Sequence, residues 1–151
     1  MDFYIPVKIF DEENSVWNHK KELATLGKKA LIVTGKRSAK LNGSYEDVVK
    51  ALDSEGVAHV LFDEVEENPS METVMKARDL GVTEGVDFVI GIGGGKILDT
   101  SKAGAYYCKL PVLICPTIAS TDAPCSALSV IYTDDGVFEE YLFLPANPNL
   151  V

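Results

Sequence analysis

A chain of 151 residues, of which 46% are hydrophobic and 25% charged, is long enough to bury one core and has the composition of an ordinary globular domain. The formal net charge of -9 argues against a general nucleic-acid or membrane-surface binder, because both classes need clustered lysine and arginine. The three cysteines show no C-x-x-C spacing, no charged and apolar leader precedes the first predicted strand, and no apolar run reaches transmembrane length. We therefore expect a cytoplasmic protein in a reducing environment.

Apolar patterning and turn residues predict strands that alternate with helices along most of the chain. Strands are predicted at residues 4–10, 30–33, 58–62, 88–92 and 111–115, and helices at residues 16–26, 45–53, 70 to 81 or 85, and 96–107. Gly27 and Gly56 are expected to end the first two helices and Ser44 to cap the second. Gly81 or Gly85 is expected to end the third.

Two stretches, residues 11–15 and 63–68, are predicted to be polar loops, the second of them acidic and solvated. Near the end of the chain, residues 127–133 and 137–144 have strand-like patterns. They are joined by Asp134-Asp135-Gly136, and Asp-Gly is a strong turn signal between two strands. The sequence therefore predicts a β-hairpin there.

The alternation of strands and helices predicts a single α/β domain over residues 1–151, with a Rossmann-like, mainly parallel sheet, helices on both faces and the hairpin added at the C-terminal end. In such sheets ligands bind beyond the carboxyl ends of the strands. Three loops leave those ends, at residues 34–40, 91–96 and 116–122, and all are rich in Gly, Ser, Thr or Lys. Their convergence favours a nucleotide site.

The glycines at 93–95 follow the apolar run 88–92 and precede a predicted helix that opens near Lys96. A strand, a glycine turn and a helix N-terminus together form a phosphate site, because the backbone can approach closely and free N–H groups face the anion. The pattern is neither G-x-G-x-x-G, whose third glycine would fall on Leu98, nor a P-loop, which needs Ser or Thr at Ile97. The alternative is a tight turn that binds nothing.

Three segments, residues 2–6, 91–102 and 116–127, resemble the iron-containing alcohol dehydrogenase family. The last contains T-I-A-S-T-D-A-P-C-S-A and looks like the glycerol dehydrogenase branch, whereas residues 30–68 look more like the NADP-using propanediol or butanol dehydrogenases. The resemblance spans nearly the whole chain. One departure is that Asp11-Glu12-Glu13-Asn14 stands where the family often has Gly-x-Gly, which puts a cofactor contact there in doubt.

The resemblance implies an N-terminal α/β nucleotide-binding domain and a C-terminal helical domain whose Asp and His side chains hold Zn or Fe. The chain ends at Val151, in what resembles the last strand of the first domain, so it looks like the cofactor-binding half of a dehydrogenase. The resemblance then implies that a helical domain or chain supplies the metal ligands and that residues 1–151 alone are inactive. His19 and His59 are predicted to be solvated and packed, respectively, rather than metal ligands.

The resemblance also implies individual roles along the cofactor and substrate. Pyrophosphate contacts are expected from Gly93, Gly94, Gly95 and Lys96, adenine and ribose contacts from Thr117 and Ser120, and nicotinamide contacts from Asp99, Ser126, Leu128 and Tyr132. Asp122 is expected to face the substrate hydroxyls as the catalytic residue. The alternatives are helix-dipole stabilisation for Asp99, packing in the hairpin for Leu128 and Tyr132, and an Asx cap for Asp122.

The loop after the second predicted strand indicates NADP rather than NAD. NAD-preferring relatives carry Asp where this chain has Gly35, and a carboxylate there would repel a 2′-phosphate. Four side chains offer donors instead, those of Lys36, Arg37, Ser38 and Lys40. The alternatives are that the basic side chains only contact water and that the glycerol-type second half favours NAD.

These features predict hydride transfer between NAD(P) and the carbon of a small alcohol or polyol. Two other functions are compatible with the fold. One is an inactive half-enzyme that serves as a cofactor-binding or assembly module, and the other is an NAD-dependent lyase similar to 3-dehydroquinate synthase. The motif T-I-A-S-T-D-A-P favours the glycerol branch over the synthase. The expected partners are the substrate, a C-terminal helical domain or chain and, in a homo-oligomer, further copies of the chain.

Overall fold

The structure is a computed structural model and describes residues 14–66, 68–117, 128–132 and 138–143. The elements are α1 (Ser15–Asn18), α2 (Lys20–Ala24), β1 (Lys29–Gly35), α3 (Ser38–Leu41), α4 (Ser44–Ser54), β2 (Ala58–Val65), α5 (Met71–Glu84), β3 (Phe88–Gly93), α6 (Gly95–Cys108), β4 (Val112–Pro116), β5 (Leu128–Tyr132) and β6 (Phe138–Phe143). The predicted strand at 4–10 lies outside the described residues.

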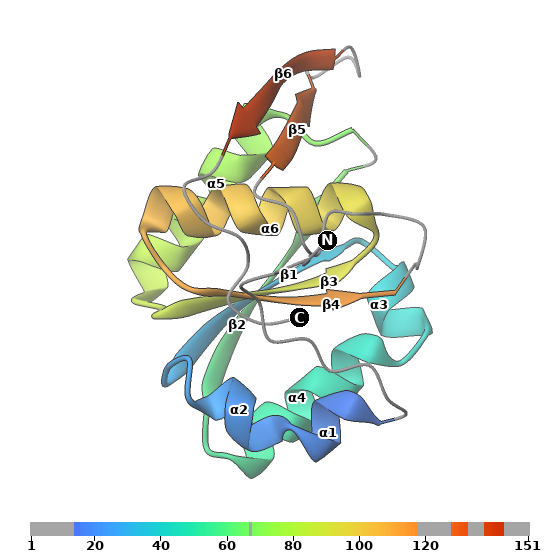
Figure 1. Cartoon of the computed structure of the whole chain (residues 1–151), viewed down its shortest axis with the longest axis vertical. Coiled ribbons are helices and arrows are strands. Elements are labelled where there is room, and N and C mark those ends of the chain that lie inside the picture. The colour runs from blue at the N-terminus through green and yellow to red at the C-terminus, as the bar shows by residue number, and fades with distance from the viewer. Residues whose placement is uncertain (1–13, 67, 118–127, 133–137, 144–151) are drawn as a thin grey trace, which may run out of the picture.

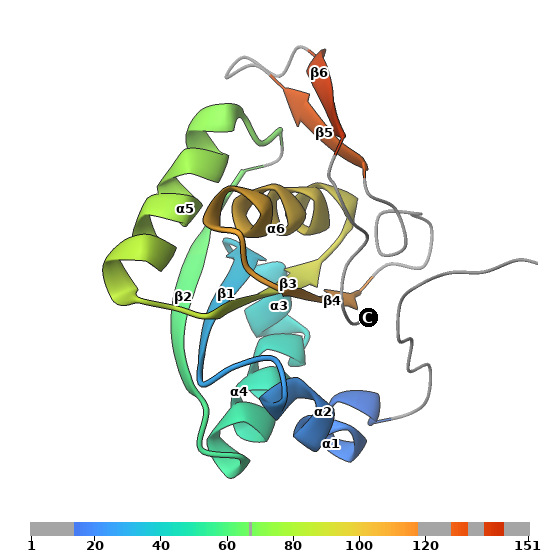
Figure 2. The same cartoon turned by 60° about the vertical axis from the view of Figure 1, so that its left-hand side comes forward.

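Four strands form a parallel sheet in the order β2-β1-β3-β4. Helices α5 and α6 cover one face, and α1 to α4 cover the other (Figures 1 and 2). This arrangement confirms the predicted Rossmann-like α/β fold. The predicted hairpin is also confirmed, because β5 and β6 pair antiparallel and lie on the α6 side of the sheet (Figure 2).

Each face of the sheet carries a hydrophobic core. Strand β1 contributes side chains to both cores, because successive side chains of a strand point to opposite faces. Ala30 and Ile32 pack with Val48 and Leu52 of α4, whereas Leu31 and Val33 pack with residues of α5 and α6. Strand β3 alternates in the same way and is buried along its whole length. Burial on both faces explains why the sequences of these two strands are nearly continuous runs of apolar residues.

The predicted first helix is wrong in form. Instead of one helix over 16–26, α1 and α2 are separated at His19, which leaves helical geometry at φ -112° and ψ 24°. Gly27 does not end α2, whose C-cap is Thr25. Gly27 is needed instead because a Cβ there would lie 2.2 Å from Oδ1 of Asp87, whose carboxylate accepts the N–H groups of Lys28 and Lys29.

Three further expectations need correction around β2 and its neighbours. The predicted acidic loop at 63–68 is wrong in its first part, because β2 continues through Val65. The loop predicted at 34–40 contains the short helix α3. Gly43, at φ 84°, is the N-cap of α4 in place of Ser44, whose hydroxyl donates to Ala39 O. The first turn of α4 therefore begins one residue earlier than predicted.

The predicted start of α5 near Ser70 is confirmed, and of the two glycines predicted to end it, Gly85 does so. The Ser70 hydroxyl caps the helix by accepting the N–H of Thr73. Gly85, at φ 66°, ends it in the left-handed conformation, whereas Gly81 lies inside the helix. A glycine tolerates this conformation at little cost, which is why it ends helices so often. Gly56 follows α4 in the same conformation, at φ 70°, as predicted.

Candidate dinucleotide-binding crevice

The glycine turn joins the end of β3 to the start of α6. Gly93 has a φ of 150°, and Gly94 is the N-cap at φ -87° and ψ -173°. The first intrahelical bond runs from Leu98 N to Gly94 O, at 3.0 Å. The backbone N–H groups ahead of Leu98 therefore have no acceptor within the helix, and they stand at the positive end of its dipole. This is the geometry that binds a phosphate.

Two glycines of β3 let α6 lie directly on the strand. A Cβ at Gly91 would lie 2.3 Å from Ser101 Oγ, and a Cβ at Gly93 would lie 2.6 Å from Ile97 Cδ1. Both distances are far below van der Waals contact, so any side chain at either position would push the helix away. The glycines thus fix how closely the N-terminal turn of α6 approaches the sheet.

The turn stands where the chain changes direction across the sheet. The chain leaves β1 through α3 and α4 on one face to reach β2, whereas it leaves β3 through α6 on the other face to reach β4 (Figure 1). The carboxyl ends of β1 and β3 are neighbours, with Thr34 opposite Ile92. Thr117 N also donates to Gly93 O, at 3.0 Å, so the third predicted loop starts beside the turn. Ligands of open α/β sheets bind at such switch points.

The Lys96 side chain stands on the first turn of α6 and is exposed. Its Nζ donates to Asn68 Oδ1, at 2.8 Å, which connects the first turn of α6 to the segment between β2 and α5. An anion at the helix N-terminus would therefore meet a lysine that is already positioned. Asn68 was not singled out in the sequence, because its contact with Lys96 spans 28 residues.

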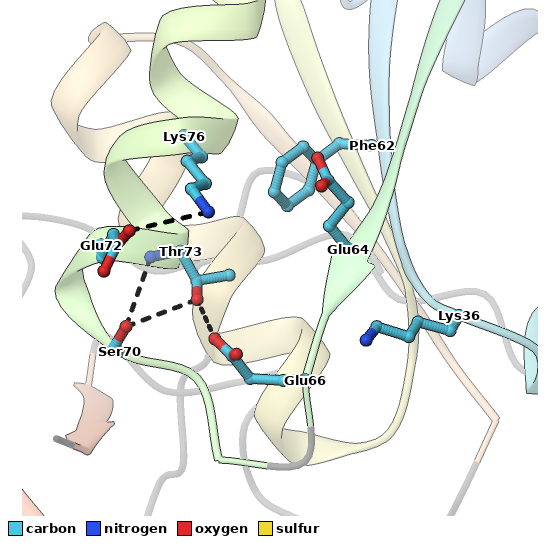
Figure 3. Close-up of a pocket in the computed structure, with 8 residues that line it drawn as sticks. All are labelled: Lys36, Phe62, Glu64, Glu66, Ser70, Glu72, Thr73 and Lys76. Carbon is cyan, nitrogen blue, oxygen red and sulfur yellow. Dashed lines mark hydrogen bonds and ion pairs between the residues drawn. The ribbon is translucent and has the colours of Figure 1, made fainter. Parts of the chain in front are cut away.

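A cavity of about 290 Å³ opens between the carboxyl end of β2 and the N-terminal half of α5 (Figure 3). It is lined by Lys36, Phe62, Glu64, Glu66, Ser70, Glu72, Thr73 and Lys76. Lys36 reaches toward it from the end of β1, and Lys76 faces it from α5 (Figure 3). The Thr73 hydroxyl donates to Glu66 Oε1. Three carboxylates and two ammonium groups therefore surround this space.

Lys40, predicted to face the cofactor ribose, is engaged elsewhere. Its Nζ lies 2.7 Å from Asp63 Oδ2 on β2. The hydrogen bond and the charge of Lys40 lower the pKa of Asp63. Ser38 begins α3 and is exposed, as are Lys36 and Arg37. Three of the four predicted donors therefore remain accessible at the end of β1.

The comparisons with known proteins agree with this geometry. The family model described as "Iron-containing alcohol dehydrogenase" matches residues 6–151. The chain belongs to the iron-containing alcohol dehydrogenase family. The resemblance inferred from the sequence is therefore confirmed.

Among its relatives, the glycerol dehydrogenase of Thermotoga maritima is 70% identical over 70 residues, 46% of this chain and 19% of that protein. The glycerol dehydrogenase of Escherichia coli is 57% identical over 82 residues, 54% of this chain and 22% of that protein. The NADH-dependent butanol dehydrogenase A of Clostridium acetobutylicum is 36% identical over 109 residues, 70% of this chain and 28% of that protein.

Solved structures extend the likeness to the whole chain. An iron-containing alcohol dehydrogenase of Thermotoga maritima superposes with a TM-score of 0.90 at 35% identity, over 99% of this chain and 46% of that one. The glycerol dehydrogenase of Schizosaccharomyces pombe superposes with a TM-score of 0.82 at 32% identity, over 99% of this chain and 37% of that one. The chain thus spans less than half the length of these family members.

Several predicted site residues of this family member lie outside what the structure describes. Ser120, Asp122 and Ser126 fall in the stretch between β4 and β5. Leu128 and Tyr132 are the first and last residues of β5, and only their backbone is described. The predicted contacts of these five residues, with the adenine and ribose for Ser120, the substrate for Asp122 and the nicotinamide for the other three, stay predictions, as do the cofactor contacts of the glycine turn.

Asp99 occupies the second turn of α6, where it pairs with a residue that the sequence did not single out. Lys102 Nζ lies 3.4 Å from Asp99 Oδ1, and the two side chains are 1% and 14% exposed. The i,i+3 spacing of opposite charges is visible in the sequence, but most such helix pairs are exposed. The small residues that follow, Ala103 to Ala105, are the signal that this side of α6 is buried.

Two remaining expectations concern metals and membranes. Across the described ranges, no three His, Cys, Asp or Glu side chains gather as metal ligands. His59 is half-buried, and its Nε2 lies 3.0 Å from Asp53 Oδ1, whereas His19 lies between α1 and α2. No helix in the described part is long and apolar enough to cross a membrane.

Proposed function

We propose that this domain binds a nicotinamide dinucleotide along the carboxyl edge of its sheet, for hydride transfer to and from the carbon of a small alcohol of the glycerol type. The observation that carries the proposal is the N-terminus of α6, reached through Gly93 and Gly94 at the switch point of the sheet. The names of the relatives support the substrate class, because two of them are glycerol dehydrogenases.

The pyrophosphate would lie against the first turn of α6, where the free N–H groups and the helix dipole stabilise negative charge. Lys96, held by Asn68, would add a charge-assisted hydrogen bond. The adenosine end would extend toward the end of β1, with Thr117 and Ser120 contacting the adenine and ribose. The nicotinamide end would lie toward Asp99, Ser126, Leu128 and Tyr132. The bound nicotinamide supplies the hydride acceptor or donor, and Asp122 would orient the substrate hydroxyls.

The family's metal ligands are proposed to lie outside residues 1–151, in a helical domain. A bound Zn or Fe ion would polarise the alcohol oxygen. We therefore propose that residues 1–151 bind cofactor but do not oxidise alcohols alone. The test is NAD(P)-dependent glycerol oxidation by this chain with added zinc, with and without a helical half. Oxidation by the chain alone would contradict this part of the proposal.

Cofactor binding itself is tested by Gly94→Val. The backbone at Gly94 is extended, a conformation open to any residue, so the variant should fold. Its isopropyl group would stand where the pyrophosphate lies, and calorimetry should show at least a tenfold loss of affinity, about 1.4 kcal/mol. The matched control is Ala58→Val, at the exposed amino end of β2. Unchanged binding in Gly94→Val would refute the assignment of this turn.

A further inference from the structure

The Ile97 side chain connects the ends of β1 and β3 beneath the proposed cofactor site. Its Cδ1 lies 3.1 Å from the position that a Cβ would occupy at Gly35, and 2.6 Å from the corresponding position at Gly93. One methyl group therefore faces the last residues of both strands. Ile97 also packs against the core between the sheet and α5 and α6.

The same methyl group also lies close to the backbone at Gly93. On the other side, it already fills the space that a side chain at Gly93 would need, and Ile97 Cβ and Cγ2 lie only 3.2 and 3.3 Å from that same position. The backbone of Gly35 itself is not in the left-handed region, so it does not require a glycine. What restricts residue 35 is therefore Ile97 rather than backbone strain.

We propose that Ile97 is a specificity-determining residue, whose Cδ1 methyl couples the side chain at position 35 to the placement of the phosphate-binding turn. A Cβ at 35 would push Ile97, and Ile97 stands on the first turn of α6. The displacement would move the N–H groups proposed to hold the pyrophosphate. A carboxylate that selects NAD through the ribose would then weaken both cofactors unless Ile97 is also shortened. The part of this inference that concerns cofactors rests on the proposed function.

The test is a double-mutant cycle of Gly35→Ala and Ile97→Val in the full chain. Ile→Val removes only the Cδ1 methyl, and Gly→Ala adds only the Cβ. With Ile97 intact, Gly35→Ala should lower the melting temperature by about 3 °C and weaken both cofactors about 5-fold. In the Ile97→Val background, the same change should shift binding less than about 2-fold. Ile114→Val, which shortens a buried side chain of β4, is the matched control and should add to Gly35→Ala without coupling.

The second arm introduces the carboxylate. Gly35→Asp alone should weaken NAD and NADP together, and adding Ile97→Val should restore NAD while NADP stays at least tenfold weaker. Melting temperatures measured without cofactor separate the structural role of Ile97 from the proposed binding of a dinucleotide. Additive effects of Gly35→Ala and Ile97→Val on melting would overturn the role of Ile97. Coupled melting together with no dinucleotide binding by the wild type would instead refute the proposed function.

Discussion

Lys102 and Asp99 form an ion pair inside the phosphate-binding helix, with Nζ and Oδ1 3.4 Å apart and the lysine side chain only 1% exposed. Transferring an ammonium group out of water is costly, and a nearby carboxylate offsets part of that cost. The pair lies one turn below the glycine turn, on the helix whose N-terminus is proposed to bind the cofactor. Its integrity therefore affects both the stability of α6 and the position of Asp99.

We expect Lys102→Met to destabilise the protein strongly. The change leaves the Asp99 carboxylate mostly buried without this partner, and breaking a buried pair from one side costs roughly 3 kcal/mol. Urea unfolding followed by circular dichroism measures the loss. The double variant Lys102→Met with Asp99→Leu should recover part of it, because both charges are then removed.

The control for this prediction is Lys76→Met on α5. Lys76 also pairs with a carboxylate of its own helix, that of Glu72 at 3.6 Å, but the side chains are 60% and 63% exposed. An exposed pair of this kind contributes about 0.5 kcal/mol at most. Equal effects of Lys76→Met and Lys102→Met would contradict the importance assigned to the buried pair.

Substitutions at two glycines distinguish the effect of close packing between helix and strand from the effect of helix propensity. Gly91→Ala should destabilise by about 2 kcal/mol, since its Cβ would meet Ser101 Oγ at 2.3 Å and force α6 off the strand. Gly104→Ala should be neutral or stabilising by up to about 1 kcal/mol, because the nearest atom is Ala77 Cβ at 3.9 Å and alanine favours helices. Thermal unfolding of the two variants checks this. Destabilisation by Gly104→Ala as large as by Gly91→Ala would refute the explanation.

The fold was predictable where the secondary structure that the local sequence favours is also the one that buries its apolar residues. Strand β3 and helix α6 follow one another directly, from an apolar run, a glycine turn and a helical pattern. The extension of β2 was missed because β2 lies at the edge of the sheet formed by the described strands, where Asp63 and Glu64 can face solvent without leaving the sheet. The break at His19 has no comparable signal in the sequence.

The candidate site was predictable only in its backbone part. The three loops were placed at one edge from the alternation of strands and helices, which predicts a parallel sheet. In contrast, the contacts of Ile97 with the ends of two strands depend on how closely α6 packs, which no local pattern specifies. Lys40 was assigned to the cofactor because its partner, Asp63, lies 23 residues further along the chain. Side-chain pairing across such separations has to be seen in three dimensions.

The Lys40–Asp63 pair should make a small, pH-dependent contribution to stability. Lys40 holds the pKa of Asp63 below its ordinary value of 3.8. The stabilisation is therefore complete above about pH 4 and is lost as the pH falls through the folded-state pKa. The side chains are 42% and 39% exposed, so we expect less than about 1 kcal/mol. Urea unfolding of wild type and Lys40→Met should differ at neutral pH and converge once the pH is well below the folded-state pKa; a difference that grows toward low pH would contradict the assignment.

Cys115 should be inert to alkylation in the native protein. Burial raises the pKa of its thiol to about 12, so at about pH 8 only about one molecule in ten thousand carries the reactive thiolate. Iodoacetamide treatment followed by peptide mass spectrometry should leave Cys115 unmodified until the protein is unfolded. Cys108 is the comparison, because both cysteines are half-buried and burial raises the pKa of Cys108 too. Labelling of native Cys115 faster than Cys108 would show that the end of β4 opens more readily than its packing implies.

The predicted preference for NADP over NAD can be tested at Lys36. Gly35 leaves no carboxylate at the end of β1, and Lys36, Arg37 and Ser38 are exposed there. A charge-assisted hydrogen bond from Lys36 to the 2′-phosphate would contribute roughly 1.5–3 kcal/mol. Lys36→Gln should therefore weaken NADP at least tenfold while leaving NAD nearly unchanged, because NAD lacks the 2′-phosphate that Lys36 would contact. Lys40→Gln is the matched control and should change the ratio of the two dissociation constants little, since Lys40 already binds Asp63.

Tighter NAD than NADP binding by the wild type would overturn the predicted preference. The glutamates of the neighbouring cavity would then explain the result, because their negative charges disfavour a 2′-phosphate.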